Sequence, residues 1–234
     1  MIQAIPTGNE ELDMRLGGGV PIPSLIMIEG GHGSGKSVVA QQIVYGALKS
    51  SLRVFYVTTE ATVREFILQS RRVSLDLSQP FIKGMLKVYP IHLEGARWTR
   101  ETASKMLPIL GKFAMATADE WDLFVVDSFS VLAVFASVEG VMDVLTRFKQ
   151  ITSSNKVIIL TVHPNSMGED AMIRARAVCD GYIRLRVTDF GGRMVKVMEV
   201  VKLRGALGPV DSTIVFDVDP AFGIKILPIS FART

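Results

Sequence analysis

The chain has 234 residues, a mass of 25.6 kDa, a formal net charge of +3 and a sequence pI near 9.0. This length is enough for one α/β domain with a substantial core, and we predict a single domain over residues 1–234. The single cysteine, Cys179, excludes an intrachain disulfide, and with only three scattered histidines it argues against a zinc site. The mildly basic charge does not favour nucleic-acid binding.

Apolar residues make up 48% of the chain, and the mean hydropathy of +0.33 is high for a soluble protein. Strands buried on both faces, or an apolar surface that meets a partner, would explain this. The most apolar stretch, residues 123–142, contains Asp127, Glu139 and three serines, so we predict a strand, a turn and a helix rather than a membrane span. The N-terminus has no export-signal pattern, and we expect a cytoplasmic protein.

Apolar runs typical of buried parallel strands alternate with helical segments over most of the chain. In chain order the predicted elements are a strand at 25–29, a helix at 36–50, a strand at 53–58, a helix at 62–73, a strand at 85–91, a helix at 98–119, and strands at 123–126 and 157–162. The last third differs, because it predicts a hairpin of strands at 182–187 and 194–203, then strands at 213–218 and 223–227. The sequence therefore predicts an α/β fold with a mainly parallel sheet and a C-terminal antiparallel β extension.

A glycine-rich motif follows the first predicted strand. The residues Gly30-Gly31-His32-Gly33-Ser34-Gly35-Lys36-Ser37 fit the pattern G-x-x-x-x-G-K-[ST], and a helix-forming segment continues through Val38. Glycines let successive backbone N–H groups surround a phosphate, and the start of the helix favours an anion. Lys36 would lie near the β- and γ-phosphates, and the Ser37 hydroxyl would bind Mg²⁺. The alternative is an ordinary glycine-rich turn, which the flanking strand and helix make the weaker interpretation.

Three further polar residues follow predicted strands. Asp127 ends an apolar run, as expected of a carboxylate that holds Mg²⁺, although such a residue is often only a turn former or helix cap. Glu60 could activate a water, or could simply be a helix-start acid. His163 could contact the γ-phosphate or the attacking water, or could be a structural histidine. All of them fall at the carboxyl ends of strands, where open α/β sheets bind ligands, so we expect them to meet at one nucleotide site.

Two cations, Lys202 and Arg204, end a strand of the C-terminal extension. Strand alternation places them on one face, where they could clamp a triphosphate. Taken alone, such strand-end cations are most simply solvated surface residues.

Several further motifs resemble RecA-superfamily domains of the KaiC type over essentially the whole chain. They are Thr7-Gly8 with Leu12-Asp13, Gly17-Gly18-Gly19 and Pro21 before the glycine-rich loop, and Asp127-Ser128, Lys202-Leu203-Arg204-Gly205 and Gly223-Ile224-Lys225-Ile226 after it. This resemblance implies a RecA-like P-loop core with helices on both faces of the sheet, binding ATP and Mg²⁺. Within the family the chain is most similar to the single-domain accessory proteins of the archaellum motor, on residues 7–13, 30–33, 58–60 and 62–64.

The resemblance also implies roles for individual residues. Lys202 and Arg204 match family residues that reach the γ-phosphate of a neighbouring subunit, which implies a homo-oligomer, expected to be a ring. Many family members carry two adjacent acids where this chain has Glu60-Ala61, so hydrolysis is expected to be weak or absent while ATP binding is kept. The implied role is a nucleotide-dependent switch that docks to the motor ATPase and to its membrane platform or cytoplasmic ring proteins. Contact with the cytoplasmic face of the archaeal membrane would then be indirect.

Two alternatives stay open on the sequence. One is an active ATPase of DNA recombination or repair, similar to RecA or Rad51. The segment after His163 has two acids and no aromatic residue, which is unlike a single-strand-binding loop, so no nucleic-acid partner is expected. The other is a KaiC-like kinase that phosphorylates itself, for which Thr58 and Thr59 lie near the presumed γ-phosphate.

Overall fold

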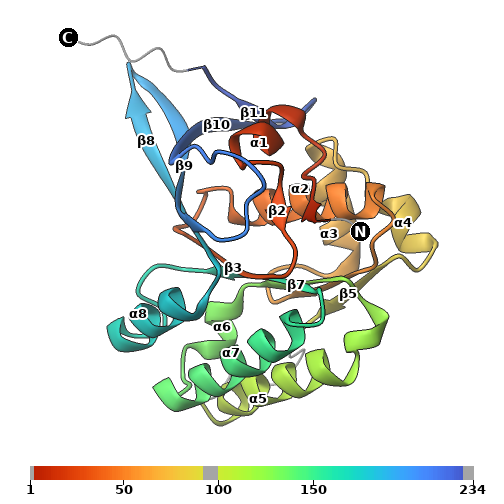
Figure 1. Ribbon diagram of the computed structural model, residues 1–234, viewed down its shortest axis with the longest axis vertical. Helices are drawn as coiled ribbons and strands as arrows, with labels where there is room; N and C mark the ends of the chain where they lie inside the picture. The colour runs from red at the N-terminus through yellow and green to blue at the C-terminus, as the bar shows by residue number, and fades with distance from the viewer. Residues whose placement is uncertain (1–2, 92–99, 229–234) are drawn as a thin grey trace.

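A computed structural model describes residues 3–91 and 100–228 and shows one large, twisted sheet between two layers of helices (Figure 1). Nine strands form this sheet in the order β11-β10-β9-β8-β3-β7-β6-β4-β5. A separate two-stranded antiparallel pair, β1 (Ala4–Ile5) and β2 (Val20–Pro21), lies before the main sheet in the chain.

The middle and one side of the sheet are parallel. These strands are β3 (Ser24–Gly30), β4 (Val54–Thr58), β5 (Leu86–Pro90), β6 (Leu123–Asp127), β7 (Val157–Val162) and β8 (Gly181–Phe190). Every residue of β3, β4, β6 and β7 is buried, because helices cover both faces of these strands. Their continuous apolar runs are the reason that the sequence predicts them to within about a residue.

The C-terminal extension is antiparallel, as predicted. Its strands are β9 (Arg193–Leu203), β10 (Thr213–Asp219) and β11 (Gly223–Ile226). The β8–β9 hairpin is longer than predicted, because β8 continues to Phe190 and the chain reverses at Gly191 and Gly192, both with positive φ. One end of this hairpin projects away from the helices (Figure 1).

Helices pack on both faces of the sheet, as the resemblance implies. One layer contains α1 (Glu10–Arg15), α2 (Lys36–Lys49), α3 (Val63–Arg72) and α4 (Ser78–Ile82). The other contains α5 (Arg100–Ala116), α6 (Phe129–Ala133), α7 (Val138–Thr152) and α8 (Glu169–Val178). Alternate residues of β3 divide between the two cores: Ile26 and Ile28 face α2, whereas Leu25 and Met27 face the α5–α8 layer.

The helices differ from the predictions in two respects: α7 continues to Thr152, beyond the helix predicted within residues 123–142, and two short helices are present. The five-residue helices α4 and α6 have too few turns to show a helical period, and the sequence did not predict α4. The helix predicted at 98–119 is α5, which contains Pro108 and ends at Ala116 before a 3₁₀ turn at Ala118–Glu120; residues 98 and 99 lie outside the described residues.

The apolar stretch at 123–142 forms β6 and the start of α7, as predicted, with the short helix α6 between them where a turn was expected. Within residues 3–91 and 100–228, the structure contains no helix with the length and apolar character of a membrane span.

Candidate functional site

The glycine-rich loop joins β3 to α2 at the carboxyl edge of the parallel strands. Gly33 and Gly35 have φ of +71° and +94°, conformations that suit glycine, and Gly35 precedes the first residue of α2. A Cβ on Gly30 would collide with the Ser34 hydroxyl, which donates a 2.8 Å hydrogen bond to the Gly31 carbonyl. The loop therefore brings its backbone close to the helix start, where N–H groups are free to bind an anion.

Lys36 is the first residue of α2 and is only 6% exposed. Its ammonium donates a 3.0 Å hydrogen bond to the Gly31 carbonyl. Burial lowers the pKa of Lys36, and the negative charges of Glu60 and Asp127 oppose that shift. The side chain thus places a largely desolvated cation inside the loop, with carboxylates nearby.

Asp127, at the end of β6, is 3% exposed and is held by two hydroxyl groups from neighbouring strands. Tyr56 Oη of β4 donates to one carboxylate oxygen at 2.7 Å, and Thr161 Oγ1 of β7 donates to the other at 2.6 Å. Burial and the adjacent charge of Asp127 raise the pKa of Tyr56 well above its usual value, which keeps the phenol a donor. The carboxylate orientation is therefore fixed by the packed sheet itself.

A chain of polar contacts joins the ends of β4, β6 and β7. The Thr59 amide donates to the Asp127 carbonyl at 2.8 Å, and the Ser128 amide donates back to Thr59 Oγ1 at 3.1 Å. Ser128 and Ser130 share a 2.7 Å hydroxyl contact, and Ser130 Oγ accepts from the His163 amide at 3.1 Å. These contacts fix the three strand ends relative to one another.

Glu60 and His163 meet next to the loop. His163 Nε2 lies 3.6 Å from Glu60 Oε1, and the His163 and His32 rings have centroids 4.5 Å apart. Burial, and then the charges of Lys36 and His32, lower the pKa of His163, while Glu60 opposes this shift. At neutral pH the imidazole is therefore uncharged and able to accept or donate a hydrogen bond.

These residues surround an open cleft of about 340 Å³. The cleft is lined by His32, Gly33, Gly35, Lys36, Ser37, Val38, Glu60, His163, Lys196 and Val218. The structure thus brings the predicted loop, Glu60 and His163 together, with Asp127 buried beside Lys36. The volume of the cleft lies within the range of small-ligand sites.

Lys202 and Arg204 lie at the opposite edge of the sheet from the glycine-rich loop. Leu203 pairs with Gly181, which in turn pairs with Ile26 near the start of β3, whereas the loop follows the end of that strand. Lys202 Nζ donates to the carbonyls of Arg176 and Ala177 at the end of α8, at 2.8 and 3.4 Å, and Arg204 is exposed. Neither cation belongs to the cleft of its own chain.

The Ser37 hydroxyl lines the cleft and the Asp127 carboxylate is buried beside it, and both are oxygen groups of the kind that binds Mg²⁺. A carboxylate that accepts two hydrogen bonds still has lone pairs for a metal or a metal-bound water. Within the described ranges no group of three or more His, Cys, Asp or Glu residues could hold a metal. An ion here would take its remaining ligands from nucleotide oxygens and water, which is the usual arrangement for Mg²⁺.

Sequence reasoning missed several residues that shape the site. Tyr56 and Thr161 sit inside apolar strand runs, and only the strand order brings both of them to Asp127. Lys196 and Val218 come from β9 and β10 of the extension. In the sequence they look like ordinary strand residues, and no motif distinguishes them.

The site combines a strand, a glycine-rich loop and a helix that starts with a buried lysine. Together with a carboxylate fixed two strands away, this arrangement defines a RecA-like P-loop domain. The protein-family model described as "ATPase: KaiC" matches residues 5–230. The chain belongs to this KaiC-like ATPase family, and it is similar over nearly its whole length to archaeal FlaH proteins.

Two relatives and one crystal structure show this similarity. The "Archaeal flagellar ATP-binding protein FlaH" of Sulfolobus acidocaldarius is 37% identical, over 98% of this chain and 99% of its own. The protein of the same description from Methanocaldococcus jannaschii is 34% identical, over 95% of this chain and 94% of its own. The crystal structure of flagellar accessory protein FlaH from Methanocaldococcus jannaschii superposes with a TM-score of 0.88 and 31% identity, covering 98% of this chain and 100% of that one.

Proposed function

We propose that this chain is an ATP-binding subunit that regulates or assembles an archaellum motor and hydrolyses ATP weakly or not at all. The observation that carries the proposal is the cleft in which the buried Lys36 and the fixed Asp127 flank the glycine-rich loop. The printed names of the FlaH relatives, which describe ATP binding and the archaeal flagellum, support the same conclusion.

In this proposal the loop residues 30–38 bind the phosphates of ATP. Lys36 turns from the Gly31 carbonyl to the β- and γ-phosphates, and the backbone N–H groups at the start of α2 take the remaining negative charge. Ser37 and Asp127 hold Mg²⁺, directly or through water, which neutralises the charge on the phosphates.

Weak hydrolysis follows from the surroundings of Glu60. Its neighbour Ala61 is 5% exposed and packs in the core with α2 and α3, so the chain presents one carboxylate where the resemblance to KaiC-type domains implies two. Glu60 itself lies beside His163 rather than alone in the cleft. General-base assistance contributes about 10²–10⁴ in rate, which is the loss expected if Glu60 alone cannot activate the water. His163 would then sense the γ-phosphate.

A homo-oligomer, expected to be a ring, is part of the proposal. Lys202 and Arg204 lie at the edge opposite their own cleft, so they can contact a nucleotide only on a neighbouring copy. Arg204→Ala should reduce the ATP-induced oligomer while leaving the thermal stability of the monomer unchanged, because Arg204 is exposed. Sedimentation with and without ATP measures this, and an oligomer of unchanged size in the variant would contradict the role in trans.

The proposed partners are the archaellum motor ATPase and its membrane platform or cytoplasmic ring proteins, at the cytoplasmic face of the membrane. The test is binding of the purified chain to the motor ATPase with ATP, with ADP and without nucleotide, with Lys36→Ala as the control. We expect docking that requires ATP and is lost in the control. Equal docking without nucleotide would contradict the switch.

A further inference from the structure

The cleft has two ends that come from different halves of the sheet. Glu60 and His163 follow β4 and β7 on one side of the glycine-rich loop, whereas Lys196 and Val218 lie on β9 and β10 on the other side. The loop follows β3, which stands between these two groups of strands. An extended ligand bound across the loop must therefore have one end at each group.

Lys196 lies directly against the start of the phosphate-binding helix. It pairs across the sheet with Phe216, and both side chains pack on Gly35: a Cβ there would be 3.4 Å from Lys196 Cδ and from the Phe216 ring. Only 22% of the Lys196 side chain is exposed. Its ammonium is thus held at the mouth of the loop, on the side away from Glu60.

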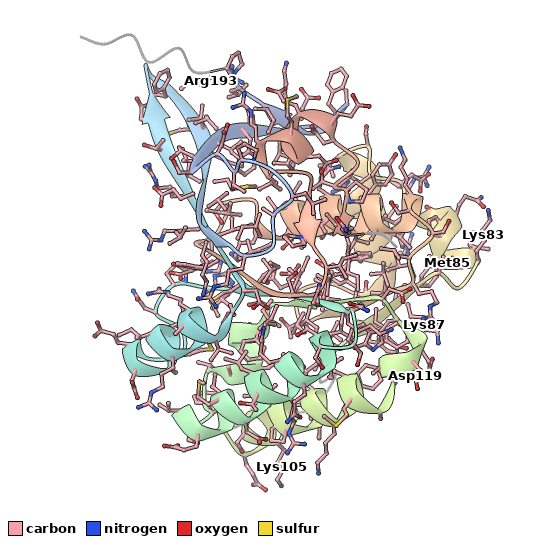
Figure 2. The ribbon with its side chains drawn as sticks, viewed as in Figure 1. Lys83, Met85, Lys87, Lys105, Asp119 and Arg193 are labelled. Atoms are coloured by element: carbon pink, nitrogen blue, oxygen red, sulfur yellow. The ribbon has the colours of Figure 1, made fainter. Side chains whose placement is uncertain are left out.

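Asp217 keeps Lys196 in place. Asp217 Oδ1 lies 3.2 Å from Lys196 Nζ, and its other oxygen accepts a 3.1 Å hydrogen bond from Arg193. Arg193 is 68% exposed and does not line the cleft; it lies at the projecting end of the hairpin (Figure 2). One carboxylate therefore holds two cations, only one of which can reach a ligand.

From this arrangement we propose that Lys196 binds the α-phosphate of the nucleotide and that Val218 contacts the base, so that β9 and β10 form the nucleoside half of the cleft. The inference rests on the proposed ATP binding, which places the γ-phosphate toward Glu60, His163 and Asp127. The α-phosphate and the nucleoside then extend toward the cation and the apolar side chain of the extension. Because ATP and ADP share the α-phosphate, Lys196 contributes equally to the binding of both.

The test is the affinity of the full chain for Mg-ATP and for Mg-ADP, by calorimetry, in Lys196→Met, Lys196→Arg and the matched control Arg193→Met. Both methionine variants remove one positive charge that contacts Asp217. We expect Lys196→Met to weaken ATP and ADP binding by about tenfold each, the effect of losing one hydrogen bond to a charged group. Lys196→Arg should keep most of the affinity, and Arg193→Met should keep all of it.

Three results would overturn the inference while leaving the proposed function intact: wild-type affinity in Lys196→Met, a loss for ATP but not for ADP, or an equal loss in Arg193→Met. The first result would show that Lys196 does not contact the nucleotide, and the second that it contacts the γ-phosphate. The third would show that the loss of affinity arises through Asp217. A wild-type protein that binds neither nucleotide would overturn the proposed function, and the inference with it.

Discussion

At one end of the cleft, Glu60 and His163 follow buried parallel strands and Asp127 is buried beside the cleft, whereas at the other end Lys196 and Val218 come from the antiparallel extension. Asp127 is fixed by two hydroxyl donors inside the core, whereas Lys196 is held by one partly exposed ion pair. Buried hydrogen bonds to a charge are strong and rigid, and partly exposed ion pairs are weak and adjustable. The comparison indicates that the end proposed to hold the metal is preset and that the end proposed to hold the nucleoside adapts to its ligand.

The largest effect is expected at the centre of the cleft. Lys36→Ala removes the cation that both ends share, so we expect ATP affinity to fall by more than about 100-fold, the loss of charge-assisted hydrogen bonds. The fold should persist, because the substitution removes a buried charge that is costly to desolvate. Calorimetric titration and a melting curve measure the two quantities. Tight binding in a folded variant would show that the loop is not the phosphate site.

Asp127→Asn tests the preset end. The amide lacks the charge that would hold Mg²⁺, so the Mg²⁺-dependent part of ATP affinity should fall by about tenfold. The measurement is ATP binding over a series of Mg²⁺ concentrations. Glu60→Gln serves as the matched carboxylate control. An unchanged dependence of ATP affinity on Mg²⁺ in Asp127→Asn would mean that the metal binds elsewhere.

Tyr56→Phe tests whether the hydroxyl donors fix the orientation of the Asp127 carboxylate. The ring would still pack on Phe66, where the centroids are 4.5 Å apart, but one hydrogen bond to the carboxylate would be lost. We expect a loss of about 1 kcal/mol in the free energy of unfolding, measured by denaturant titration. Thr161→Val, which removes the other donor, should cost a similar amount. Unchanged stability in both variants would contradict a rigidly held Asp127.

The smallest expected effect is the pH dependence of stability that comes from His163. Its pKa is lowered in the folded protein, chiefly by burial, so below the usual value of 6.5 the unfolded chain binds a proton that the folded chain does not. Stability should therefore fall as pH is lowered from 6.5 toward the folded pKa, and His163→Gln should flatten this slope. Denaturant midpoints between about pH 7.5 and 5.5, without nucleotide, would measure it; an unchanged slope in the variant would contradict the assignment.

The sequence predicted the parallel half of the molecule better than the rest for a physical reason. Strands buried on both faces need continuous apolar runs, and polar residues that end such runs, such as Asp127 and His163, stand out. The glycine-rich loop was likewise visible because its conformation and its phosphate chemistry restrict the residue types.

Other features depend on strand order, which the sequence does not state. Tyr56 reaches Asp127 only because β4 and β6 are neighbours, and Lys196 reaches Gly35 only because the extension continues the sheet on the loop side. The position of Lys202 and Arg204 at the far edge follows from the antiparallel direction of β9, which the hairpin pattern had predicted. Their role on a neighbouring subunit stays a prediction.

The central claim is that the cleft holds ATP without consuming it, and the most direct measurement is the fate of the bound nucleotide. The purified chain is incubated with Mg²⁺ and labelled ATP, and the nucleotide that stays with the protein is identified over many hours. We predict intact ATP, because Glu60 acts without a second acid. Mostly ADP, with continued release of phosphate, would contradict the account and would identify a working ATPase.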